Sequence, residues 1–163
     1  MRKTDKYYFF YKHILGQWHK FDFTVEGITF NCPEQWMMYQ KAILFNDQAS
    51  ADKILLEKHS YQQQQLGRTV KGYKQDKWDA YKFEIVKQGN LHRFRADEEG
   101  RKVLFSTAPL ILVEASPVDR VWGIGLGEGD PLADDENNWR GSNLLGKALT
   151  EVRTILMKEY GAV

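Results

Sequence analysis

Residues 21–41 read FDFTVEGITFNCPEQWMMYQK, and this stretch decides the fold class because its hydrophobic period changes partway along. Phe21 to Val25 alternates apolar and polar side chains, and Ile28 to Phe30 is a second short run after Glu26-Gly27. Two such runs around a glycine predict a β-hairpin with its turn at Gly27.

The same stretch then changes to a helical pattern. Asn31 or Cys32 is suited to cap a helix, and Pro33 is suited to the first helical position, where a backbone N–H would lack a partner anyway. We therefore expect a helix from Pro33 to about Phe45.

Outward from this stretch, helical spacing predicts more helices than strands. Asp76 is the expected cap of one helix, and Gly161 is expected to stop the last. The expected helices cover Asp47–Glu57, Tyr61–Val70, Asp76–Phe94, Asp97–Phe105 and a final segment from Asn143 through Leu156.

The only further strand expected is the branched apolar run Leu110–Glu114. The segment from Trp122 to Gly141 is rich in Gly, Asp and Asn, and we expect a functional loop that is too polar to pack. The sequence thus predicts an α+β class: a predominantly helical domain with a small sheet, formed by the N-terminal hairpin and the strand near 110–114.

Composition favours one domain and narrows the partners. The chain has 163 residues, a length typical of one domain, and we expect a single domain over 1–163. Lys and Arg number 23 against 22 for Asp and Glu, so no net basic field favours nonspecific nucleic-acid binding. Cys32 is the only cysteine, which excludes an intrachain disulfide and fits a reducing compartment. With no signal-peptide pattern and no apolar run of transmembrane length, we expect a cytoplasmic protein without a membrane partner.

The sequence lacks strong cofactor signatures. It contains no Walker loop, no pair of close cysteines, no HExxH and no G-x-G-x-x-G, and Gly123 to Gly127 lacks the context of a dinucleotide-binding turn. The four histidines are scattered without ligand spacing. We therefore expect neither a metal nor a cofactor.

Several isolated polar residues stand among aromatic neighbours: Glu34, Gln40, Lys41, Arg68, Glu114, Asp119 and Asn143. Each has an ordinary structural explanation as well. Glu34 could stabilise the start of its helix, Asp119 could initiate a turn, and Glu114 could pair with Arg68 or Arg153. Trp36, Trp78 and Trp122 are most often core residues. Glu34 and Lys41 are seven positions apart and share one side of their helix, which also suits a solvated face.

Read together and in order, these segments resemble the NADAR (YbiA-like) family over about Phe9 to Leu156. Phe30 to Ala42 is similar to the family helix, in which a Glu is followed by an aromatic residue and a Gln-Lys pair. Gly67-Arg68 and Trp78 resemble its Gly-Arg and downstream Trp. The remaining motifs are similar to its Glu, Asp and Trp-Gly cluster and to its closing helix, and here they read Leu112–Leu126 and Trp139–Arg153.

The resemblance implies an N-glycosidase that acts on a small ribosylated, nucleotide-like substrate. Glu34 would stabilise the ribosyl cation and orient water, and Asp119 or Glu114 would protonate the leaving nitrogen. Lys41 and Arg68 would bind phosphate. Trp78 or Trp122 would stack on the base, and Asn143 would hydrogen-bond the sugar or the base edge. Gln40, next to Lys41, is grouped with these substrate-binding residues.

The resemblance leaves three functions open. Known family members cleave early ribosylamino-pyrimidine phosphates of riboflavin biosynthesis, and others remove ADP-ribose from guanine in DNA, the one alternative in which nucleic acid is a partner. The third is a noncatalytic ADP-ribose or nucleotide-binding module. Two departures from the family bear on substrate choice: Gln35 stands where many members have His, and the Trp122–Gly141 loop is the longer form.

Overall fold

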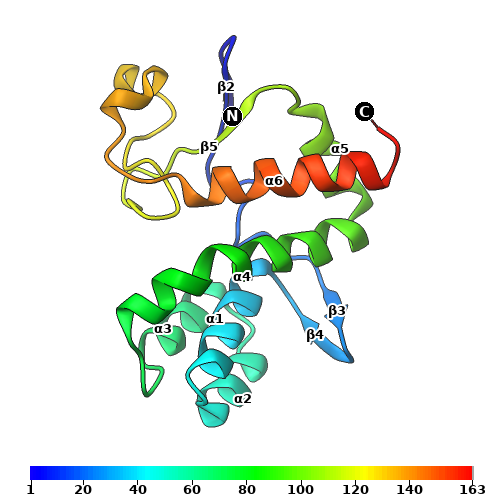
Figure 1. Cartoon of the computed structure of the whole chain (residues 1–163), viewed down its shortest axis with the longest axis vertical. Helices are drawn as coiled ribbons and strands as arrows, with labels where there is room; N and C mark the ends of the chain where they lie inside the picture. Colours follow the sequence, from blue (N-terminus) through cyan, green and yellow to red (C-terminus); the bar gives the residue numbers. More distant parts are fainter. Residues whose placement is uncertain (163) are drawn as a thin grey trace. The chain divides into compact units, whose positions relative to one another are not determined.

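The computed structural model describes residues 1–162 and confirms a mixed α+β fold dominated by helices (Figure 1). The chain forms two compact units, each described here by itself. The central unit is Gln17–Asp97, and the terminal unit combines Met1–Gly16 with the residues from Glu98 onward.

The central unit begins with the predicted hairpin. Strands β3 (Phe23–Val25) and β4 (Ile28–Phe30) are antiparallel, with Phe23 opposite Phe30. Glu26 and Gly27 have φ angles of 50° and 81°, the left-handed pair that tight hairpin turns require. The prediction of the hairpin and of its turn at Gly27 is therefore confirmed.

Four helices complete the central unit. They are α1 (Pro33–Leu44), α2 (Gln48–Leu56), α3 (Ser60–Arg68) and α4 (Gln75–Ala96), in agreement with the predicted segments to within a few residues. Pro33 opens α1 as predicted, after Cys32 as N-cap. The predicted cap of α4 is wrong: Lys74 takes that position, and Asp76 lies inside the first turn, where its charge suits the positive end of the helix.

Helix α1 packs against α2, α3 and α4. Two glycines allow the close approaches. A Cβ at Gly67 of α3 would lie 1.9 Å from Met38 Sδ, and one at Gly89 of α4 would lie 2.3 Å from Trp36 Cδ1. The indole N–H of Trp36 donates to the carbonyl of Ile85 at 2.9 Å, which fixes the ring between the two helices.

Polar groups are also buried in the central unit. Cys32 Sγ lies 3.3 Å from Gln63 Oε1 and 3.6 Å from Ser60 Oγ, and burial raises the pKa of this thiol. Arg93 pairs with Asp97 at 2.9 Å with both side chains almost fully enclosed. Such enclosed groups require fixed partners, so they specify the packing around them.

The terminal unit holds a three-stranded sheet in the order β1 (Arg2–Lys3), β2 (Tyr7–Phe10), β5 (Ile111–Glu114). The predicted strand near 110–114 is confirmed. The prediction that it forms one sheet with the hairpin is wrong, because β5 pairs with β2, whereas within residues 1–162 β3 and β4 pair only with each other. The parallel partner of β5, strand β2, was not predicted, because Tyr7 to Phe10 is buried throughout and shows no alternation. Helix α6 (Leu144–Glu159) packs on β5, and α5 (Glu98–Ser106) contacts α6.

The segment from Trp122 to Gly141 differs from the prediction that it is too polar to pack. It forms two short 3-10 helices, η1 (Pro131–Asp134) and η2 (Glu136–Asn138). Three of its apolar side chains are buried with residues of the sheet, in a cluster of Tyr7, Phe9, Val113, Ala115, Ile124, Leu126 and Ala133. The polar residues therefore cover a small apolar core.

None of the helices formed within residues 1–162 has both the length and the apolar character needed to cross a membrane.

Candidate active site

One side of α1 presents the carboxylate and the ammonium group expected from the sequence. Glu34 lies in the first turn and is only 3% exposed, and its backbone N–H donates to the carbonyl of Gln17 at 2.9 Å. Lys41 lies in the last turn, about two turns further along. Since Glu34 is buried, the alternative of a solvated surface face does not describe its position.

The environment of Lys41 is aromatic and cationic. Its Nζ lies 4.7 Å from the ring centroid of Tyr73 and 5.4 Å from that of Trp78. Burial lowers the pKa of Lys41, the charge of Arg68 lowers it further, and the charge of Glu34 opposes both effects. Glu34, Lys41 and Arg68 therefore act on one another electrostatically within the central unit.

Arg68 reaches this group because α3 packs closely on α1. The absence of a side chain at Gly67 lets the end of α3 approach Met38, and Arg68 is the next residue. Arg68 is exposed, so its guanidinium remains available to a ligand. A guanidinium beside an ammonium group is an arrangement that binds phosphate oxygens.

The two rings near Lys41 differ in exposure. Trp78, the predicted stacking residue, is 8% exposed, whereas Tyr73 is 39% exposed. Tyr73 also contacts Phe45 at a centroid distance of 5.4 Å, and its hydroxyl donates to Gln75 Oε1. Sequence reasoning missed Tyr73, whose only signal is an aromatic residue in an otherwise polar connection between α3 and α4.

Gln35, which stands where many family members have His, has a structural role. Its Oε1 accepts from the Asn31 N–H at 2.7 Å, and its Nε2 donates to the carbonyls of Ile54 at 2.9 Å and Glu57 at 3.1 Å. The side chain thus joins the start of α1 to the end of α2. The departure at position 35 therefore concerns the packing of α1 rather than an acid beside Glu34.

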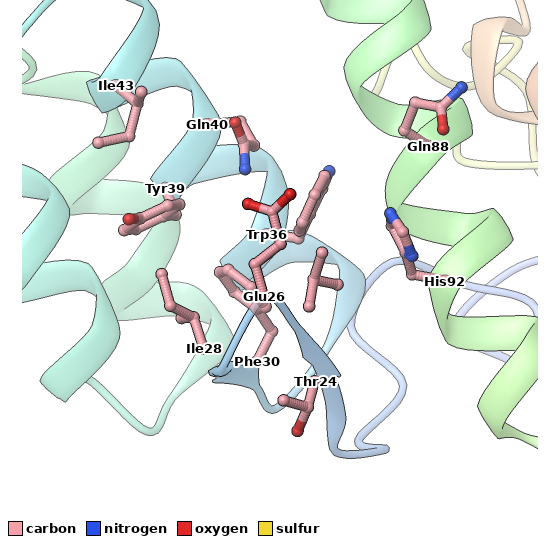
Figure 2. Close-up of a pocket in the computed structure, with 11 residues that line it drawn as sticks. Thr24, Glu26, Ile28, Phe30, Trp36, Tyr39, Gln40, Ile43, Gln88 and His92 are labelled. Carbon is pink, nitrogen blue, oxygen red and sulfur yellow. The ribbon is translucent and has the colours of Figure 1, made fainter.

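Gln40 lies away from the group around Lys41. It lines a pocket formed by the β3–β4 hairpin, α1 and α4, whose other lining residues include Trp36 and Tyr39 of α1 and His92 of α4 (Figure 2). A role for Gln40 in substrate binding stays a prediction.

In the terminal unit, Glu114 is the last residue of β5, and its carboxyl group is largely buried. Burial raises its pKa to about 8, and the charge of Asp119 adds to this effect. Its Oε2 is buried and has no hydrogen-bond partner within residues 1–162, and no ion pair joins it to Arg153, which binds Thr107 and Leu110 instead. Glu114 is therefore protonated at neutral pH, the state that a general acid requires.

Asp119 stabilises a turn, which is one of the two roles that the sequence suggested for it. Its Oδ1 accepts from the N–H groups of Val121 and Trp122, both at 2.8 Å, and its own N–H donates to Ser116 Oγ at 3.1 Å. These bonds fix the carboxylate near Glu114. Trp122 is half-buried, so part of its surface remains accessible, and its role in stacking stays a prediction.

Asn143 connects α6 to β5. It has φ of 51° as the N-cap of α6 and is 1% exposed. Its Oδ1 accepts from the Glu114 N–H at 3.0 Å, and its Nδ2 donates to the Leu112 carbonyl at 3.0 Å. The amide therefore positions Glu114, and a contact with the substrate stays a prediction.

Within residues 1–162, no three or more His, Cys, Asp or Glu side chains gather where they could hold a metal ion.

Comparison with known proteins identifies the fold and the family of this chain. A solution NMR structure of the protein YbiA from Escherichia coli superposes with a TM-score of 0.76 and 22% identity, covering 96% of this chain and 89% of that one. The fold is therefore that of a YbiA-like α+β protein. The NADAR domain profile matches residues 4–157, so the chain belongs to the NADAR domain family.

Several relatives carry enzyme names, and one, protein irg-1, does not. An N-glycosidase of Acanthamoeba polyphaga mimivirus is 37% identical over 164 residues, covering 93% of this chain and 96% of its own length. The N-glycosidase YbiA of Escherichia coli K12 is 28% identical over 135 residues, covering 83% and 76% of the two chains. Protein irg-1 of Caenorhabditis elegans is 41% identical over 128 residues, or 77% of this chain, and the match spans 60% of that protein.

Proposed function

We propose that this chain hydrolyses the bond between ribose C1 and nitrogen in ribosylamino-pyrimidine phosphates, the early intermediates of riboflavin biosynthesis. The coarser class, a hydrolase of N-glycosyl compounds, follows from the full-length relatives named N-glycosidases. The observation that carries the proposal is the buried Glu34 on the same side of α1 as Lys41, with Arg68 in electrostatic range.

Glu34 is suited to the ribose end of the reaction. As the C1–N bond breaks, positive charge develops on the sugar, and a nearby carboxylate stabilises it. The same carboxylate orients a water molecule, whose oxygen bonds to C1 and whose released proton passes to that carboxylate. The electrons of the broken bond stay on the nitrogen.

Lys41 and Arg68 are suited to the phosphate end. Arg68 offers a planar fork of donors, and Lys41 offers a compact charge held against the rings of Tyr73 and Trp78. A phosphate bound there would anchor the ribose and position its C1. We therefore propose a substrate whose sugar carries a phosphate.

The departing nitrogen needs a proton, and Glu114 of the terminal unit stays our predicted source because of the chemistry of its own carboxyl group. With its pKa raised to about 8, the carboxyl group holds a proton at neutral pH, when an ordinary glutamate does not. Asp119 would favour that protonated form through its own negative charge. We expect the reaction to take place in a reducing compartment, the cytoplasm.

A second candidate is hydrolysis of ADP-ribosylated guanine. The observation that favours it is the presence of two cationic side chains, Lys41 and Arg68, in one group, since a diphosphate offers an oxygen cluster to each. The exposed ring of Tyr73 beside them suits the additional base of such a substrate.

The test is ribose-phosphate release from the two riboflavin precursors by wild-type protein and by Glu34→Gln, with ADP-ribosylated guanine assayed in parallel. Glu84→Gln, an exposed carboxylate on α4, is the matched control and is expected to keep wild-type activity. Precursor cleavage that Glu34→Gln abolishes supports the proposal. Cleavage of the guanine adduct alone moves the assignment to the second candidate, and binding without turnover of any substrate leaves a noncatalytic module.

A further inference from the structure

We propose that the pocket between the β3–β4 hairpin, α1 and α4 binds a small organic ammonium cation, at a site separate from Glu34 and Lys41. The pocket has a volume of about 670 Å³ and lies entirely within the central unit (Figure 2). Its lining comprises Thr24, Val25, Glu26, Ile28, Phe30, Trp36, Tyr39, Gln40, Ile43, Gln88 and His92.

The pocket uses the other side of α1. Trp36, Tyr39 and Ile43 follow Glu34 by two, five and nine positions. At about 3.6 residues per turn, these spacings place all three opposite Glu34 and Lys41. The proposed phosphate-binding group and this pocket are therefore two distinct surfaces of one helix.

The formal charge of the lining is negative. Glu26 supplies a carboxylate, and no Lys or Arg lines the pocket. Burial and the charge of Arg95 lower the pKa of His92, and the charge of Glu26 opposes them. Across residues 1–162, Glu26 takes part in no hydrogen bond or ion pair. A phosphate would be repelled here, whereas a cation would be attracted.

The floor of the pocket is aromatic. Phe30 lies edge-on to Trp36 and Tyr39, with centroid distances of 5.1 and 5.3 Å, and Trp36 lies 5.4 Å from His92. The faces of such rings attract alkylammonium groups, which are weakly hydrated. The amide groups of Gln40 and Gln88 at the rim supply oxygens that accept from hydroxyl or N–H groups of the same ligand.

The hairpin turn places the carboxylate over this floor. Glu26 has φ of 50°, a conformation that hairpin turns usually give to Asn, Asp or Gly. Asn, Asp or Gly would therefore suit the turn itself better than Glu26 does. Figure 2 shows the Glu26 carboxylate extending from the hairpin toward the α1 side chains of Trp36 and Gln40.

The aromatic floor is held in place before any ligand binds. Trp36 donates to the Ile85 carbonyl at 2.9 Å, and the missing side chain of Gly89 accommodates its indole. A fixed ring loses little conformational freedom on binding, which favours even a small ligand.

The test uses choline and its uncharged isostere 3,3-dimethylbutan-1-ol as probes. Binding is followed by NMR through the indole N–H signal of Trp36. We expect choline to shift this signal and the neutral isostere to bind at least about tenfold more weakly, a difference in the range expected when a cation meets aromatic rings and a carboxylate. A peptide carrying trimethyllysine is a parallel probe, and tighter binding of that peptide would place the ammonium group on a protein side chain.

Glu26→Gln keeps the size of the side chain and removes its charge, so it should weaken choline binding about tenfold while leaving the free Trp36 signal in place. Glu99→Gln on α5, an exposed carboxylate outside the lining, is the control and should bind as wild type does. Equal affinity for the two isosteres, no shift with choline, or unchanged affinity in Glu26→Gln would each overturn the proposal.

Discussion

Glu114 has a raised pKa, and two neighbouring residues act on it. Asn143 holds its backbone, and Asp119 lies near enough for its charge to favour the protonated carboxyl group. Neither support is visible in the sequence, where Glu114 is simply the polar end of an apolar run.

The raised pKa of Glu114 predicts a stability that falls with pH. Between about 4.5 and 8 the folded state holds a proton that the unfolded chain has released, so the free energy of unfolding decreases as pH rises through this window and levels off above 8. Glu114→Gln should abolish this decrease and be more stable than wild type at pH 9, by roughly 5 kcal/mol. Urea unfolding at pH 5, 7 and 9 measures the effect, and parallel curves for the two proteins would contradict it.

The same group sets the expected pH limit of activity. If protonated Glu114 donates to the leaving nitrogen, kcat/KM falls above a pH of about 8. Glu114→Gln should lose most of the activity, and its remaining kcat/KM should no longer fall above a pH of about 8. A wild-type profile that stays flat from pH 7 to 10 would remove Glu114 from the reaction.

Lys41 offers a second prediction on the scale of single residues. Lys41→Met keeps the aliphatic stem against Tyr73 and removes the charge, so KM for a phosphorylated substrate should rise about tenfold or more, since a charged hydrogen bond is lost. Lys77→Met is a matched control, because Lys77 lies over the ring of Phe45 and belongs to no proposed site. Steady-state kinetics on both variants measure the effect. An equal rise in KM for Lys41→Met and Lys77→Met would contradict a specific role of Lys41 in phosphate binding.

On the scale of elements, Gly67 sets the distance between α3 and α1. Gly67→Ala would bring a methyl group onto Met38 Sδ, so we expect a loss of about 1–3 kcal/mol in stability and a weaker phosphate site as Arg68 moves. Gly127→Ala, with open space around it, should change stability by less than about 0.5 kcal/mol. Thermal unfolding of both variants provides the comparison, and equal melting temperatures would count against the close approach.

Helices and strands whose sequence signals come from neighbouring residues were predicted correctly, whereas a strand that depends on a distant partner was missed. The hairpin turn at Gly27 and the helix after Pro33 follow from neighbouring residues, and both were confirmed. Strand β2 was missed because its partner β5 lies about a hundred residues further along the chain, and its Tyr7–Phe10 run is buried on all sides. The buried apolar residues of the 122–141 segment were missed for the same reason.

The site residues followed a similar division. Glu34 and Lys41 share one helix, so their common side could be predicted from spacing. The contact of Lys41 with Tyr73 joins separate elements, and no local pattern indicates it. The hydrogen bonds of Asn143 to β5 likewise depend on a contact between distant segments.

On the scale of the whole molecule, the charge balance limits the alternatives. With a net charge of +1, the protein has no net basic field, so we expect it to displace few counterions from a DNA duplex. We expect the logarithm of its affinity for double-stranded DNA to fall with the logarithm of salt concentration with a slope shallower than about −2. Fluorescence anisotropy at several salt concentrations measures this slope, and a steep one would favour a nucleic-acid substrate.

The enclosure of Cys32 has a practical consequence. A maleimide reacts with a thiolate, and this thiol is buried, bonded to Gln63 and held protonated by its raised pKa. Since it is the chain's only cysteine, a new cysteine at an exposed position would be the sole point of attachment for a dye or spin label. Pairs of such labels, one in each unit, would allow distances to be followed in solution as substrates are added.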